Sequence, residues 1–316
     1  MLNYVQTMSS DMGHLAQQLS RIDDHLFLSD IVSASNEYLT HDKNIKYILT
    51  VNVRPIIHSL PPSNYLFIEA EDMWHQDLIS YFPLSYQFLN DAISARQNVL
   101  VHCVAGQSRS ATLVIAYMMK KYKLKYQEAK ERVRKGRPII SPNEKFRVQL
   151  KLYETMGYEI DRTNHEYRLI ALTHLGETLK RQFLTSFHHR AEDVRAAVNQ
   201  FLAKVDLTTV NRSSSHETVY KCRKCRVYLF NYHNMRFADY HSCSCIFLEP
   251  LPWMINFLQN TSKGDIHCPK CSTKIGIYDF SGLPCDPSCE KHSQSLNLPA
   301  FKFTKSKVDE HKPTKV

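Results

Sequence analysis

One short segment of the chain, from His102 to Ser110, contains both a nucleophilic and an anion-binding side chain. Cys103 and Arg109 are separated by five residues with small or uncharged side chains. The preceding NVLVH at 98–102 reads as a buried strand, and SATLVIAYMMKKY from Ser110 reads as a helix. The cysteine is therefore expected in a tight loop between a strand and a helix N-terminus.

This position suits phosphate chemistry, because a helix N-terminus presents unpaired backbone N–H groups and a positive dipole end. The same field favours a thiolate, so we expect Cys103 to be a nucleophile at neutral pH. Arg109 can bind two phosphoryl oxygens with its planar fork. A buried core cysteine would not explain this spacing. The residues expected to bind phosphate are Val104, Ala105, Gly106, Gln107, Ser108 and Arg109.

The segments that must position this loop alternate between short apolar runs, such as LFLSDIV and IKYILTVNV, and polar stretches of helical character. That alternation predicts an α/β layer fold. HCVAGQSRS resembles the signature of the protein tyrosine phosphatase superfamily, in its dual-specificity branch, and the resemblance extends over roughly residues 22 to 156. It implies a central mixed sheet flanked by helices.

The resemblance also implies a general acid about thirty residues before the cysteine, where Asp72 is the candidate and Glu71 and Asp77 are alternatives. In the implied mechanism Cys103 attacks phosphorus while Asp72 protonates the leaving group, and Asp72 then activates water to hydrolyse the phosphocysteine. Ser110 is expected to help the cysteine leave. No metal is needed in this site.

Two further positions match the family. His102 is expected to order the loop by hydrogen bonds, and Asn143 is expected to support it from the next segment. The loop side chains are uncharged, whereas phosphoinositide phosphatases of the superfamily tend to carry lysines there and RNA triphosphatases carry a different loop. The resemblance thus implies a phosphoprotein substrate, on tyrosine and on serine or threonine.

Helix signals mark the end of this domain. Ser141 suits an N-cap, Pro142 the first helical position and Glu144 the capping box, while Gly157 can end the helix in a left-handed turn. Residues from about 165 to 205 also read as helical.

Eight of the nine cysteines lie between Cys222 and Cys289. Cys222 and Cys225, and likewise Cys268 and Cys271, have the C-x2-C spacing that presents two thiolates to one tetrahedral zinc ion. Each pair needs two further ligands to complete a tetrahedral zinc site, and the cysteines and histidines of this region are enough for two such sites. The available partners are Cys243, Cys245, Cys285, Cys289, His233, His241, His267 and His292.

Residues 219 to 309 resemble the zinc-binding tail of the subfamily formed by the glucokinase-associated dual specificity phosphatase and its fungal relatives. The match implies two structural zinc ions. His241 is the implied fourth ligand of the first ion, and His233 and Cys245 are its alternatives. Members of this subfamily act in maturation of the large ribosomal subunit, where the tail can suffice without catalysis. The implied ligand sets are Cys222, Cys225, His241 and Cys243 for one ion, and Cys268, Cys271, Cys285 and Cys289 for the other.

The expected organisation is an N-terminal extension (1–21), a catalytic domain (22–160), a helical connector with a linker (161–216), a zinc-binding domain (217–310) and a tail (311–316). No secretory signal or apolar run of membrane-spanning length is apparent. We therefore expect a cytoplasmic and nuclear protein without membrane association. A net charge of +9 suits an anionic partner. The sequence predicts a phosphatase of phosphoproteins, or alternatively a ribosome maturation factor that binds a pre-ribosomal particle or rRNA through its zinc domain.

Overall fold

In a computed structural model, the chain divides into two compact units, Met1–Asp161 and Arg162–Val316. The structure describes residues 19–185, 191–207, 218–236, 244–259, 261–280, 282–283 and 300–312. Residues 1–18 of the predicted N-terminal extension and most of the predicted linker before residue 217 lie outside these ranges, whereas β1 begins at Ser20. Within them, no helix combines the length and apolar character that crossing a bilayer requires.

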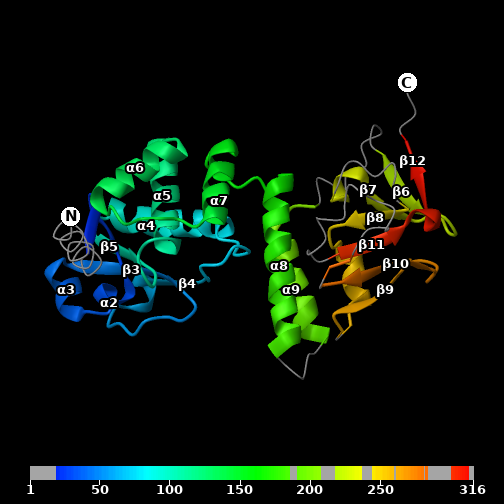
Figure 1. The fold of residues 1–316 in the computed structure, drawn as a ribbon, viewed down its shortest axis with the longest axis horizontal. Coiled ribbons are helices and arrows are strands. Elements are labelled where there is room, and N and C mark those ends of the chain that lie inside the picture. The colour runs from blue at the N-terminus through cyan, green and yellow to red at the C-terminus, as the bar shows by residue number, and fades with distance from the viewer. Residues whose placement is uncertain are drawn as a thin grey trace, which may run out of the picture. The chain divides into compact units, whose positions relative to one another are not determined.

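The first unit is built on a mixed sheet of five strands in the order β1-β2-β5-β3-β4 (Figure 1). β1 and β2 form an antiparallel hairpin, and β2, β5, β3 and β4 run parallel to one another. The central β5 confirms the strand predicted at 98–102. The strands are β1 (Ser20–Asp23), β2 (Leu26–Ser29), β3 (Ile45–Asn52), β4 (Tyr65–Glu69) and β5 (Asn98–His102).

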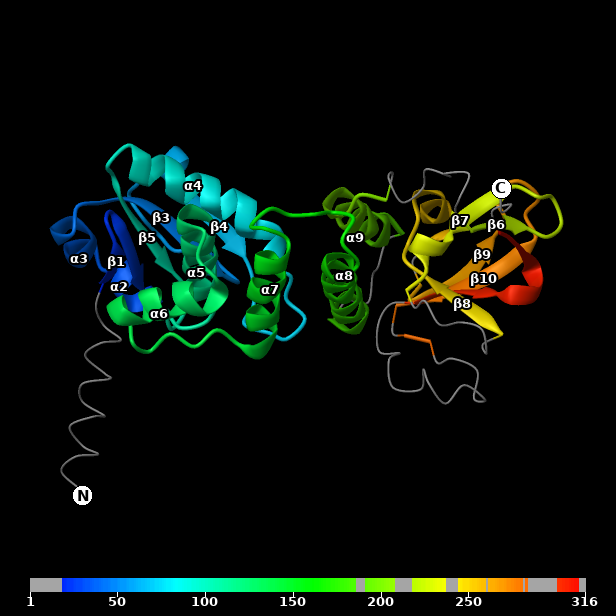
Figure 2. The same cartoon turned by 90° about the horizontal axis from the view of Figure 1, so that it is seen from above.

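Helices cover both faces of this sheet, as expected of strands that are buried on both sides. α4, α5, α6 and α7 lie over one face, whereas the short α2 and α3 lie on the other (Figures 1 and 2). This arrangement confirms the predicted α/β class. The helices are α2 (Ile31–Ala34), α3 (Glu37–Asp42), α4 (Phe82–Ser94), α5 (Arg109–Tyr122), α6 (Tyr126–Gly136) and α7 (Glu144–Thr155), with 3-10 turns at Pro62–Asn64 and Ile79–Tyr81.

The start of α7 differs from the prediction. Its N-cap is Asn143, not Ser141, because the Asn143 side chain accepts a hydrogen bond from the Phe146 amide at 2.9 Å. The Ser141 amide instead donates to the carbonyl of Gln107 at 2.8 Å. Tertiary contact with the cysteine loop therefore holds Ser141 outside the helix.

The helix ends as predicted. Gly157 has a φ of +69° directly after the C-cap. The Gly157 amide donates to the backbone carbonyl of Glu154, and the Tyr158 amide donates to the backbone carbonyl of Tyr153, each at 3.0 Å. This is the hydrogen-bond pattern of a Schellman motif.

The second unit combines two helices, which lie side by side, with two small sheets (Figures 1 and 2). One sheet has the order β8-β11-β10-β9 and the other β12-β6-β7. The elements are α8 (His165–Thr185), α9 (Ala191–Lys204), β6 (Val219–Cys222), β7 (Tyr228–Asn231), β8 (Cys245–Leu248), β9 (Lys263–His267), β10 (Lys274–Asp279), β11 (Ala300–Thr304) and β12 (Val308–His311), with 3-10 turns at Tyr232–Asn234, Pro252–Phe257 and Lys305–Lys307.

The helices predicted as a connector pack within this second unit. Arg168 on α8 is buried and its guanidinium Nε lies 3.0 Å from the carboxylate of Glu249, which follows β8 and is also buried. A buried charge pair is stable only when both partners stay in place, so α8 is held to the sheets. Aromatic side chains fill the core of the unit, namely Phe230, Phe247, Tyr278, Phe280, Phe301 and Phe303.

Candidate active site and metal centre

Cys103 lies at the carboxyl end of β5, one residue after the strand and six before the first residue of α5. Its side chain is buried, and its sulfur accepts hydrogen bonds from the amide of Gly106 at 3.2 Å and the hydroxyl of Ser110 at 3.1 Å. Two hydrogen-bond donors therefore contact the sulfur that the sequence predicts as the nucleophile.

The loop around Cys103 is held in shape by its carbonyl groups. Four consecutive carbonyl oxygens accept hydrogen bonds from groups outside the loop, whereas the Gly106 amide is directed at the cysteine sulfur. The pairs are Val104 O with the Ile31 amide (3.1 Å), Ala105 O and Gly106 O with the Arg137 side chain (3.2 and 2.9 Å) and Gln107 O with the Ser141 amide (2.8 Å).

Gly106 is the one position of the loop that requires glycine. Its φ is +65°, and a Cβ built there would lie 2.3 Å from the carbonyl oxygen of Ser29. Both the backbone conformation and the close approach of β2 exclude a side chain.

Arg109 is anchored through one end of its guanidinium. Nη1 donates to Asn52 Oδ1 and to the carbonyl of Ala70, both at 3.1 Å. Nε is buried and has no hydrogen-bond partner among the described residues. A buried donor without a partner costs free energy, and an incoming oxyanion can offset this cost by accepting its hydrogen bond. The anchored guanidinium is therefore preset to bind a phosphoryl group.

Asp72 is the candidate acid that the structure brings to the loop. Its Oδ1 accepts from Ser108 Oγ and from Asn143 Nδ2, both at 2.7 Å, and its Oδ2 lies 3.9 Å from Arg109 Nε. The two donors on Oδ1 leave Oδ2 as the oxygen that faces the anion-binding arginine.

The two alternative acids occupy other positions. Asp77 is fully buried and caps the turn after it, since its carboxylate accepts from the amide and hydroxyl of Ser80. Glu71 lies 3.8 Å from His75. Asp72, in contrast, accepts a hydrogen bond directly from Ser108 of the cysteine loop.

His102 is buried behind the cysteine. Its Nε2 lies 2.8 Å from Thr50 Oγ1 and its Nδ1 lies 3.4 Å from the carbonyl oxygen of Cys103. A carbonyl only accepts, so Nδ1 carries the proton and the Thr50 hydroxyl donates to Nε2. Burial lowers the pKa of His102 to about 4, so the ring is neutral at physiological pH.

Arg137 is a residue of the site that the sequence reasoning missed. It is fully buried, although arginine is almost never so unless paired, and it bonds the loop carbonyls of Ala105 and Gly106. It also donates to Ser20 Oγ at 3.1 Å and lies 3.7 Å from the Asp30 carboxylate. Arg137 lies in the basic stretch after Lys120, where one buried arginine cannot be told from solvated neighbours.

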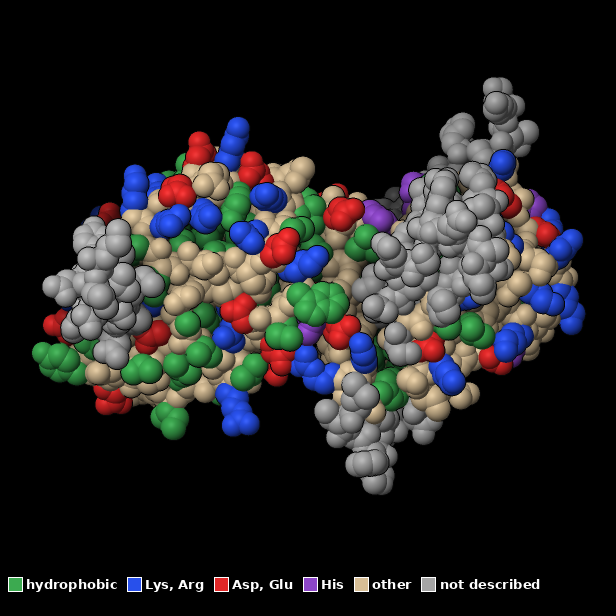
Figure 3. Space-filling view, in the orientation of Figure 1, with side chains coloured by type: hydrophobic (Ala, Val, Ile, Leu, Met, Phe, Trp, Pro, Cys, Tyr) green, Lys and Arg blue, Asp and Glu red, His purple; other side chains and the backbone are tan. Residues whose placement is uncertain are grey.

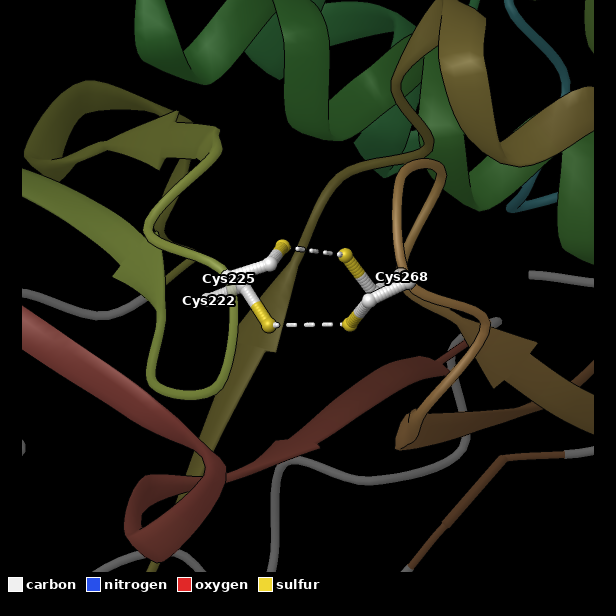
Figure 4. A group of neighbouring side chains, drawn as sticks. Cys222, Cys225 and Cys268 are labelled. Atoms are coloured by element: carbon white, nitrogen blue, oxygen red, sulfur yellow. Dashed lines mark hydrogen bonds between the residues drawn. The ribbon is translucent and has the colours of Figure 1, made fainter.

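The second unit contains a cluster of four cysteines, formed by Cys222, Cys225, Cys268 and Cys271. The first pair lies at the turn between β6 and β7, and the second pair lies at the turn between β9 and β10 (Figure 4). The two turns share one geometry, since the residue after each second cysteine, Arg226 or Ser272, has a positive φ.

The cluster fits zinc. The sulfurs of Cys222 and Cys271 are 3.7 Å apart, those of Cys225 and Cys268 are 3.5 Å apart, and all four lie within 4.8 Å of one another. A tetrahedral ion with Zn–S bonds of about 2.3 Å holds its sulfurs about 3.8 Å apart, whereas a disulfide needs about 2.05 Å. The four thiolates can therefore hold one zinc ion with no position left for substrate.

This grouping corrects the predicted partition of the ligands. The two C-x2-C pairs do not begin separate sites but meet in one, because the hairpins that carry them face each other. Cys245 is buried on β8 and is not a member of the cluster, and His233 is exposed in the turn after β7. The other predicted ligands, His241, Cys243, Cys285 and Cys289, lie outside the described residues.

Comparison with known proteins agrees with the loop geometry. A family model described as dual specificity phosphatase, catalytic domain, matches residues 26–156. The tyrosine-protein phosphatase yvh1 of Schizosaccharomyces pombe is 33% identical over 301 residues, which cover 92% of this chain and 84% of that protein. The dual specificity protein phosphatase 12 of Mus musculus is 30% identical over 330 residues, which cover 96% and 91%.

Among solved structures, the Yvh1 phosphatase domain from Chaetomium thermophilum is 32% identical, covers 44% of this chain and 95% of that chain, and has a TM-score of 0.38. The curated relatives align along both units, and the family model covers the cysteine loop and the acid. The chain therefore belongs to the family of the yvh1 tyrosine-protein phosphatases and dual specificity protein phosphatase 12, and its first unit is a dual specificity phosphatase catalytic domain.

Proposed function

We propose that the protein hydrolyses phosphotyrosine in proteins, and phosphoserine and phosphothreonine as further substrates, through a phosphocysteine intermediate. The observation that carries this proposal is the buried sulfur of Cys103, which accepts two hydrogen bonds and lies in the same loop as Arg109, whose Nε has no hydrogen-bond partner among the described residues. These are the parts that phosphoryl transfer to a thiolate needs.

In the first step the Cys103 thiolate attacks phosphorus, the P–S bond forms and the bond to the leaving oxygen breaks. Asp72 delivers its proton to that oxygen from Oδ2, since Oδ1 is engaged by Ser108 and Asn143. In the second step Asp72 as carboxylate takes a proton from the attacking water. The thiolate then leaves, stabilised by the hydroxyl of Ser110.

Steady-state hydrolysis of p-nitrophenyl phosphate and of matched phosphotyrosine, phosphoserine and phosphothreonine peptides tests this proposal. We expect a bell-shaped dependence of kcat/KM on pH, no turnover by Cys103→Ser, and loss of about 100-fold or more in kcat by Asp72→Asn with the acid-dependent limb removed. A flat profile between pH 5 and 8 would contradict the acid–base assignment. Turnover that survives Cys103→Ser would refute the mechanism.

The second unit supports a separate proposal, that it binds a partner in large ribosomal subunit maturation without need of catalysis. The observation that favours it is the separation of the molecule into two units, with the cysteine cluster and an aromatic core in the second and the phosphatase loop in the first. Lys224 is exposed beside the cluster, whereas Arg223 and Arg226 already pair with Asp309. Of the three cations in that turn, Lys224 is therefore the one best suited to contact a phosphate backbone.

Rescue of cells lacking the endogenous protein separates the two functions. The intact chain is compared with Cys103→Ser and with a double variant in which Cys268 and Cys271 are replaced by serine. Failure of folded Cys103→Ser makes dephosphorylation the essential act. Rescue by Cys103→Ser, failure of the double variant and salt-dependent co-sedimentation with pre-ribosomal particles would support the binding function.

A further inference from the structure

A groove of about 830 Å³ lies between α6 and α7 in the catalytic domain. It is separate from the cysteine loop, and none of its lining residues takes part in the chemistry described above. Lys and Arg side chains, with Asp and Glu among them, gather on the face of the molecule over these helices (Figure 3). The groove is lined by Lys125, Tyr126, Gln127, Lys130, Glu144, Arg147, Val148, Lys151, Glu154 and Thr155.

The lining carries more cations than carboxylates, because its four Lys and Arg residues stand against only Glu144 and Glu154. Lys125, Lys130, Arg147 and Lys151 make no ion pair with any described residue, whereas the carboxylate of Glu154 is engaged by the amide of Tyr126 at 2.8 Å. Four unpaired cations around one groove favour an anionic ligand.

The groove begins beside the active site. Asn143, which donates to the candidate acid Asp72, caps α7, and the next residue, Glu144, already lines the groove. From Glu144 to Thr155 the lining residues of α7 follow one face of the helix for about 16 Å at about 1.5 Å per residue. An extended peptide of about five residues covers that length.

We propose that this groove, defined by the lining residues above, binds an acidic segment of the substrate protein that flanks the phosphorylated residue. Anionic side chains of that segment would pair with Lys130, Arg147 and Lys151. The inference rests on the proposed phosphatase function and names the substrate class, which is phosphoprotein segments rich in Asp and Glu.

Two phosphotyrosine peptides of equal length test it, differing only in whether the three outermost residues on each side are Glu or Gln. The full chain is assayed with both, and each variant is normalised to its own turnover of p-nitrophenyl phosphate. We expect the Glu peptide to have about tenfold lower KM than the Gln peptide at low salt, because several exposed ion pairs, each of modest strength, add together. The difference should shrink at 0.3 M salt, where the screening length is short.

A variant with Lys130→Gln, Arg147→Gln and Lys151→Gln should lose the preference. The matched control carries Lys46→Gln, Lys135→Gln and Lys145→Gln, which are exposed, do not line the groove and remove the same charge. Lys145 lies on α7 itself, so the control separates the groove from general attraction.

The outcomes distinguish the groove from the catalytic site. Equal KM for the two peptides in the wild type, or an unchanged preference in the groove variant, would overturn the groove proposal while turnover persists. Absence of all turnover by the wild type would instead refute the phosphatase function. A 12-nucleotide RNA that binds the wild type but not the groove variant, without any peptide preference, would assign the groove to nucleic acid.

Discussion

Buried, neutral His102 should make the catalytic domain sensitive to mild acid. Burial lowers the pKa of this histidine from its ordinary value of 6.5 to about 4, against the weaker opposing effects of the Cys103 carbonyl and Asp30. Between these two values the unfolded chain binds more protons than the folded one. The free energy of unfolding therefore falls as the pH decreases through this window, and the contribution is fully present above pH 6.5.

The size of the effect follows from the shift, at about 1.4 kcal/mol for each pKa unit. When both pKa values are used, the free energy of unfolding falls by about 2 kcal/mol between pH 7.5 and 5, and by about 3 kcal/mol by pH 4. These are large fractions of the stability of an ordinary domain. The change in His102 protonation would also disturb the loop, because Nδ1 and Nε2 bridge Cys103 and Thr50.

Urea unfolding of the full chain measures this, with His102→Asn as the variant that cannot titrate. The chain has two tryptophans, Trp74 in the first unit and Trp253 in the second, so a Trp253→Phe background reports the catalytic domain through Trp74 alone. We expect His102→Asn to be less stable at pH 7.5 and to lose about 2 kcal/mol less than the parent by pH 5. Parallel losses in the two proteins would refute the reasoning.

Three further predictions follow from the geometry. Arg137→Met should lower kcat/KM on the order of 100-fold, because the loop carbonyls of Ala105 and Gly106 lose their donor, with Arg137→Lys recovering part of the loss in a steady-state assay. Ser110→Ala should slow departure of the thiolate more than its formation, so that a burst of product and a trapped phosphocysteine appear in rapid-quench measurements. Chelation of zinc should unfold the second unit, seen through Trp253 fluorescence, while p-nitrophenyl phosphate turnover persists; loss of turnover in step with that unfolding would contradict the independence of the site.

The sequence was sufficient where chemistry depends on residues close in the chain. The spacing of Cys103 and Arg109 between a strand and a helix predicted the loop, because the strand, turn and helix start within a dozen residues position both groups. The C-x2-C spacing likewise predicted that Cys222 and Cys225 form one half of a metal site, since the turn alone sets the separation of the two sulfurs.

Tertiary structure decided everything that depends on how distant segments meet. Which cysteine pairs share an ion depends on two hairpins more than forty residues apart, and the pattern of one hairpin carries no information about the other. The same reason applies to Arg137, whose burial depends on β1, β2 and the loop, and to the choice of Asn143 over Ser141 as the N-cap. Whether Arg147 and Lys151 are solvated charges or the wall of a groove was decided by the packing of α6 against α7, because a charged side chain looks the same in sequence on either surface.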